Sequence, residues 1–272
     1  MGARALKCVL EADEPIELED YRSDNPLATW DEMRDDGVGR EVYKTVRATL
    51  VNSQGGLCAY CELGVDPNDP LKSRVEHFHP KGDQTGGHNW ALDWSNMIAV
   101  CHGGSQRALG APYTLEPLSD NLSCDAYKDK MIQSGELQEK CEGWLLNPKS
   151  VPVSPCLLFL EKSTGKLIPD EESCENVMLA ENQHEDVKSL VQNTIDMLNL
   201  NCDRLCMSRR QVIWNIENKK KKKRNNGYTA QQGLLEIAEF YFRTNWPQFF
   251  TTVRLSLGPE AEKYLIDINF QG

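Results

Sequence analysis

Four of the ten cysteines in this 272-residue chain fall between residues 57 and 128, and their spacing constrains the fold more than any other feature. Two residues separate Cys58 from Cys61, which lets both thiolates of a tight turn bind one metal ion. Cys101 and Cys124 follow further along the chain. One zinc ion bound by all four thiolates would fix the shape of a segment that has few large apolar residues. We therefore expect a structural zinc site made by these cysteines.

Polar residues with a second kind of chemistry lie between and beside the cysteines. His77 suits a general base because the ordinary pKa of histidine, about 6.5, lies near neutral pH. Glu76 and Asp125 offer hard carboxylate oxygens of the kind that bind Mg²⁺ or Mn²⁺. Neighbours on an extended strand face opposite ways, so we expect Glu76 and His77 to lie in a turn or loop. A base beside a divalent ion is the arrangement that hydrolyses phosphodiesters.

The order of these motifs resembles that of the HNH (ββα-metal) nucleases, and in particular the PtuB-like HNH proteins of the Septu and retron anti-phage systems. The segments that carry the resemblance are Leu57 to Glu62, Glu76 to Lys81, Trp94 to Asn96, Cys101 to Gly104 and Cys124 to Lys128. The resemblance implies a metal-dependent endonuclease that cleaves DNA. It also implies Zn²⁺ as a structural ion and Mg²⁺ or Mn²⁺ as the catalytic ion.

The same resemblance assigns roles to individual residues. Asn96 would be the middle residue of the His-Asn-His name and would orient His77 or its loop. Asp125 would stand where many relatives carry the last histidine and would bind the catalytic ion together with Glu76. Lys81 and Lys128 are candidate phosphate contacts, although a surface lysine is usually only solvated.

One departure from the simplest HNH pattern leaves two assignments open. Residues 102–123, 22 in all, separate Cys101 from Cys124, where many relatives have two. The fourth zinc ligand and the second catalytic ligand are therefore uncertain from sequence, and His79 and His102 are the rivals.

The net charge of the chain is −11, with 41 acidic against 30 basic residues. A nuclease that grips DNA alone usually carries a basic face, because lysine and arginine release counterions from phosphate. We infer that the grip is weak or comes from a partner. The resemblance implies such a partner, a PtuA-like ABC-type ATPase that would hold the nuclease in check, and admits a retron RNA or DNA component. Residues 219–224 are six consecutive bases, which make either a solvated helix end or a nucleic-acid contact.

Two other functions remain open at this stage, a free-standing nuclease or toxin and a non-catalytic zinc adaptor. The chain shows no export signal, so the remaining cysteines are expected to be reduced thiols in the cytoplasm. No apolar run reaches the roughly 20 residues that span a bilayer, so we expect no membrane association.

These features predict an α+β protein that is mostly helical. We expect an N-terminal helical segment over residues 1–56, an HNH ββα-metal module over 57–130, and a C-terminal hairpin plus helical region over 131–272 used for partner docking. Acid-rich residues 11–20 are expected to form a loop, and residues 249–270 show no clear pattern. The expected helices cover residues 29–34, 40–52, 186–198, 203–220 and a segment from 229, and the hairpin strands cover 156–160 and 166–168.

Overall fold

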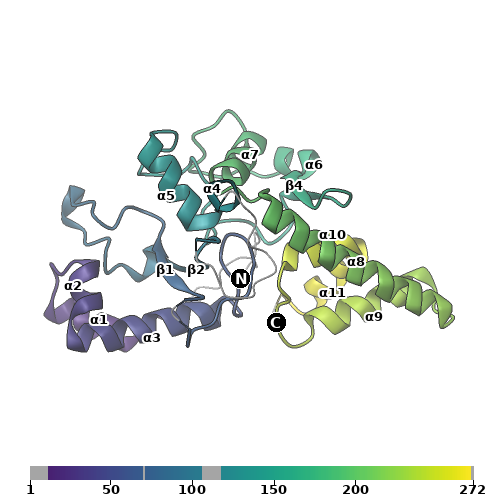
Figure 1. The fold of residues 1–272 in the computed structure, drawn as a ribbon, viewed down its shortest axis with the longest axis horizontal. Coiled ribbons are helices and arrows are strands. Elements are labelled where there is room, and N and C mark those ends of the chain that lie inside the picture. The colour runs from purple at the N-terminus through teal and green to yellow at the C-terminus, as the bar shows by residue number, and fades with distance from the viewer. Residues whose placement is uncertain (1–11, 70, 106–117, 271–272) are drawn as a thin grey trace.

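The computed structural model describes residues 12–69, 71–105 and 118–270. Cys8 and the middle of the expected insertion, residues 106–117, lie outside the described residues. The described part is rich in helices and contains two separate two-stranded antiparallel sheets (Figure 1). The expectation of a helix-rich α+β protein is confirmed. None of the described helices has the length and apolar character needed to cross a membrane.

Three helices make up the N-terminal part, α1 (Ile16–Asp24), α2 (Trp30–Asp35) and α3 (Gly37–Ser53). Thr29 begins α2 through the expected capping box, in which its side chain accepts from the Glu32 amide and the Glu32 side chain accepts in return. The amphipathic helix predicted over residues 40–52 is confirmed as α3. The loop predicted for residues 11–20 is wrong from Ile16 onward, because α1 begins there and packs its one fully buried residue into the core.

The central part contains strands β1 (Arg74–His77) and β2 (Met97–Val100), which pair antiparallel with His77 opposite Met97. Gln54, at the end of α3, holds this ribbon: its Nε2 donates to the carbonyls of Leu57 and Ala99 at 2.9 and 2.8 Å. Its Oε1 accepts from the Ala99 amide at 2.8 Å. The short helices η1 (Thr85–Gly87), η2 (Trp94–Asn96), α4 (Leu118–Asn121) and α5 (Cys124–Ser134) complete this part.

The C-terminal part begins with the predicted hairpin, β3 (Leu158–Glu161) and β4 (Lys166–Pro169), which is confirmed. The helices predicted after it are confirmed as α7, α8 and α9, but α8 continues to Asn225, so the basic run lies inside the helix. Residues 249–270 form two further helices. The bounds are α6 (Glu171–Glu175), α7 (Val187–Met197), α8 (Asp203–Asn225), α9 (Ala230–Phe242), α10 (Phe250–Leu257) and α11 (Pro259–Asp267).

One buried apolar cluster takes residues from the N-terminal, central and C-terminal parts, for example Leu18, Leu92 and Val191. A second cluster fills the space among α8, α9, α10 and α11. Figure 1 shows α8 and α9 side by side at one end of the long axis, with α1 and α2 at the other.

Glu62 is a buried glutamate that joins the cysteine turn, from Cys58 to Cys61, to the C-terminal helices. The Thr251 amide, in the first turn of α10, donates to Glu62 Oε2 at 2.9 Å, and the Thr251 hydroxyl donates to Glu62 Oε1 at 2.6 Å. The Phe249 amide donates to the Glu62 carbonyl at 3.0 Å. A carboxylate at a helix N-terminus satisfies free amides and complements the helix dipole. Glu62 therefore anchors α10 directly beside Cys61.

Candidate functional site

The four predicted cysteines converge on one point. The Sγ atoms are 3.6 Å apart for Cys61 and Cys101, 3.8 Å for Cys101 and Cys124, and 3.9 Å for Cys58 and Cys124. Four sulfurs at the usual zinc–sulfur distance of about 2.3 Å form a tetrahedron with edges of about 3.8 Å. All four side chains are buried. Among the described residues, they are the group in which three or more His, Cys, Asp or Glu ligand atoms lie close enough to bind one ion. The donor set and its geometry are compatible with structural zinc.

A tight contact brings Cys101 and Cys124 together in spite of the insertion between them. The Ser123 amide donates to the Gly103 carbonyl at 2.9 Å. Gly103 has a φ of +58°, and a Cβ at this position would lie 2.0 Å from the Ser123 carbonyl oxygen, so only glycine fits. The rival ligands His79 and His102 do not belong to the cysteine group.

The two predicted carboxylates lie beside each other in the central part. Glu76 lies on β1 and Asp125 in the first turn of α5, and both are buried. Each has a cation beside it: the Lys128 ammonium contacts Glu76, and Arg74 Nε lies 2.6 Å from Asp125 Oδ2. Burial acts to raise the pKa of Glu76, but attraction to Lys128 and hydrogen bonds with Asp125 and Lys128 together outweigh it, and the pKa lies below its ordinary value. Burial and the charge of Glu76 raise the pKa of Asp125 well above its ordinary value.

His77 is the last residue of β1, so the expected turn at Glu76 and His77 is wrong. The two side chains take different partners, as neighbours on a strand do. His77 Nε2 lies 3.0 Å from the carbonyl oxygen of Ala91. The His77 and Trp30 rings form a T-shaped contact with their centroids 4.6 Å apart. A carbonyl can only accept, so Nε2 carries the proton and Nδ1 has a free lone pair in the neutral ring. Burial lowers the pKa of His77 to about 4, which leaves the ring neutral at pH 7.

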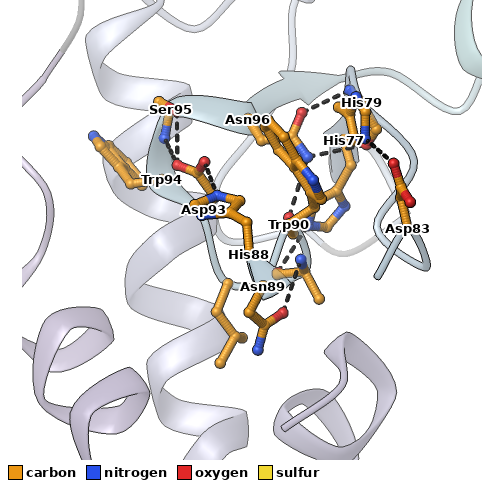
Figure 2. A network of polar contacts seen from close by, with 12 residues as sticks. His77, His79, Asp83, His88, Asn89, Trp90, Asp93, Trp94, Ser95 and Asn96 are labelled. Atoms are coloured by element: carbon orange, nitrogen blue, oxygen red, sulfur yellow. Dashed lines mark hydrogen bonds and ion pairs between the residues drawn. The ribbon is translucent and has the colours of Figure 1, made fainter. Parts of the chain in front are cut away.

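Asn96 holds the loop that follows β1 and does not touch the His77 ring. Its Oδ1 accepts from the His79 amide at 2.6 Å, and its Nδ2 donates to the carbonyls of His79 and Trp90 at 2.9 and 3.1 Å. Figure 2 shows these contacts beside the His79 ring, whose Nε2 lies 2.9 Å from Asp83. The other ring nitrogen of His79 contacts Glu142.

Replacing Asn96 with alanine should leave three backbone groups without their partners. Each unsatisfied buried group costs about 1–3 kcal/mol, so we expect lower stability and a displaced His77 loop. Chemical unfolding and plasmid nicking measured together would show both losses. Asn193→Ala is the matched control. Asn193 Nδ2 donates to the Trp144 carbonyl at 2.8 Å, and this hydrogen bond lies outside the loop. Equal nicking by the two variants would show that the loop contacts do not position His77.

A pocket of about 510 Å³ brings the predicted residues together. Glu76, His77, Lys81, Asp125 and Lys128 all line it. Lys81 is exposed at the rim, 3.7 Å from Asp31, whereas Lys128 is buried against Glu76. The residues singled out for metal binding and for base catalysis therefore share one opening to solvent.

No protein-family model matches the chain. A protein of Escherichia coli, described as an HNH endonuclease of retron Ec83, is 34% identical over 253 residues, which are 92% of this chain and 92% of the relative. The match therefore covers far more than the cysteine region. The chain belongs to the HNH endonuclease family. It is thus an endonuclease, a phosphodiester hydrolase of the HNH type, and the resemblance of its motifs to the HNH nucleases is confirmed.

The structure also places at or beside the pocket of this HNH endonuclease residues that were not singled out from the sequence. Trp30 and Arg74 line it, and the buried Tyr60 hydroxyl lies 3.5 Å from Glu76 Oε1. Arg74 precedes Glu76 by two residues, so on a strand the two share a face, which is a signal the sequence does contain. Tyr60 lies between the first two cysteines. The cysteine turn therefore contacts the carboxylate site directly.

Proposed function

We propose that the chain cleaves DNA phosphodiester bonds at the pocket lined by Glu76, His77 and Asp125. The observation that carries this proposal is that His77, whose neutral ring keeps one unprotonated nitrogen, and the two carboxylates Glu76 and Asp125 line one pocket, in a member of the HNH endonuclease family. Glu76 and Asp125 would bind Mg²⁺ or Mn²⁺, which takes one or two carboxylates and completes its shell with water and phosphate oxygens. The ion supplies neutralisation of charge on the phosphate.

In this proposal His77 takes the proton from the attacking water through Nδ1. The contact of Nε2 with Ala91 fixes the tautomer and the direction of the ring. Asn96 holds the loop around His77, and Lys81 contacts phosphate at the rim. Lys128 was expected to contact phosphate, but its burial against Glu76 favours a role in holding that carboxylate in place.

We further propose that Cys58, Cys61, Cys101 and Cys124 hold a structural Zn²⁺. The zinc ion would fix the turn that carries Tyr60 and the start of α5 that carries Asp125. Both touch the carboxylate site, so zinc would set the pocket without taking part in the reaction.

Asp125→Asn tests the metal assignment. The change keeps the shape of the side chain and removes its charge, so we expect Mn²⁺ affinity and nicking to fall by at least the roughly 10–100-fold that loss of an outer-shell partner causes. Isothermal titration with Mn²⁺ measures binding apart from activity. Asp196→Asn, which changes an exposed aspartate on α7 that does not line the pocket, is the control. Unchanged Mn²⁺ affinity in Asp125→Asn would remove this residue from the ligand set.

We propose that the nuclease acts in the cytoplasm within an anti-phage defence complex. The named relative belongs to a retron, and the net charge of −11 disfavours strong unaided binding to DNA. A PtuA-like ABC-type ATPase and a retron RNA or DNA component are the proposed partners, docked on residues 131–272. Purification alone and with the ATPase tests this: strong unaided cutting would favour a free nuclease or toxin. Absence of cutting under both conditions with Mg²⁺ and Mn²⁺ would favour a zinc adaptor.

A further inference from the structure

One face of α8 carries two exposed large apolar side chains. Met207, Trp214 and Lys221 are seven residues apart, close to two helical turns, so they lie along one line of the helix. Met207 is 46% exposed and Trp214 is 62% exposed. Large apolar side chains aligned on a surface indicate an interaction site more often than single exposed ones do.

The last two turns of α8, beside this face, carry the part of the basic run that has no ion pair. Lys220 and Lys223 form ion pairs with glutamates of α8 and α9. Lys221, Lys222 and Arg224 are exposed and form no ion pair with any described residue. In a chain with a net charge of −11, this is a local concentration of positive charge. Its complement is a polyanion.

We propose that this α8 face, made by Met207, Trp214, Lys221 and Lys222, binds a single strand of nucleic acid. Aromatic rings beside basic side chains are the means by which proteins bind unpaired strands, because every base presents a face for stacking and every linkage a charge. Trp214 would stack on a base, and Lys221 and Lys222 would neutralise phosphates. The line from Trp214 to Lys221 spans about 10 Å along the helix, enough for a few nucleotides.

The α8 face is separate from the catalytic pocket. Trp30 of α2 lines that pocket, and Figure 1 shows α8 reaching the end of the long axis opposite α2. A strand bound on α8 would therefore add a second contact to the complex without occupying Glu76 or His77. The inference does not depend on the proposed catalytic roles.

Fluorescence anisotropy with a labelled 20-nucleotide oligothymidylate tests the inference. Leaving out Mg²⁺ and Mn²⁺ prevents cleavage, so binding is measured even if the proposed chemistry is wrong. Trp214→Ala should weaken binding by about 5- to 150-fold, the contribution of one stacked base. Lys221→Ala/Lys222→Ala should reduce the slope of log Kd against log salt by about 1.4, at 0.7 for each phosphate contact.

Matched variants separate this role from a structural one. Trp214→Phe keeps an aromatic ring and should retain most of the affinity. Lys162→Ala/Lys263→Ala removes two exposed lysines outside α8 and should leave the salt slope unchanged. All variants should unfold at the wild-type temperature. Absence of oligonucleotide binding at about 50 mM salt, α8 variants that bind like wild type, or a preference for duplex would each overturn the inference. An oligouridylate probe distinguishes an RNA ligand from a DNA ligand.

Discussion

His77→Ala is expected to reduce plasmid nicking by at least the factor of about 10²–10⁴ that a positioned general base contributes. The neutral ring presents Nδ1 because Nε2 is bound to the Ala91 carbonyl, and alanine removes that lone pair. The cysteine site lies on other segments, so the variant should keep its zinc. Gel assays of nicking with Mn²⁺, together with elemental analysis of zinc, measure the two outcomes.

Two further histidine variants make the result specific. His77→Gln retains an amide that can reach the Ala91 carbonyl but has no basic nitrogen, so it should be as inactive as alanine and more stable. His88→Ala removes a half-exposed ring that contacts Asp93 at 2.7 Å and should nick like wild type. Substantial cleavage by His77→Ala would show that the base is another group.

Cys58→Ser is expected to cause the largest loss of stability. Binding of structural zinc contributes an apparent 10–16 kcal/mol, about as much as the whole stability of a typical domain. Hydroxyl is a poor ligand for zinc, and the empty site would leave three buried thiols together. We expect the variant to bind less than one equivalent of zinc and to lose the cooperative unfolding transition seen by circular dichroism.

Cys174→Ser is the control for this change. Cys174 is buried outside the metal group, and its Sγ lies 3.6 Å from the Leu157 carbonyl. The control should bind one equivalent of zinc and unfold cooperatively. If Cys58→Ser also keeps its zinc and its unfolding transition, the four thiolates are not the scaffold of this protein.

Local patterns in the sequence predicted much of the fold and of the site. The structure has three features that depend only on neighbours in the chain. They are two thiols spaced for one ion, the Thr29 and Glu32 capping box and the apolar period of α7. The α1 helix gave no such signal, because it buries only Leu18 and is held by tertiary packing.

The turn predicted at Glu76 and His77 was wrong for a different reason. The prediction assumed that both side chains must reach one face, whereas residues from both faces of β1 line the pocket. The partner of His77 is a backbone carbonyl 14 residues away, at Ala91. A backbone atom has no residue type, so no sequence motif marks it.

The Glu62 anchor has a consequence for how this nuclease is made. Glu62 and Thr251 are 189 residues apart, so a ribosome must synthesise and release the whole segment between them before the two can meet. Until then the buried carboxylate beside Cys61 lacks the amide and hydroxyl that satisfy it. The turn from Cys58 to Cys61 is therefore incomplete in a growing chain, and it is completed only after α10 has been made.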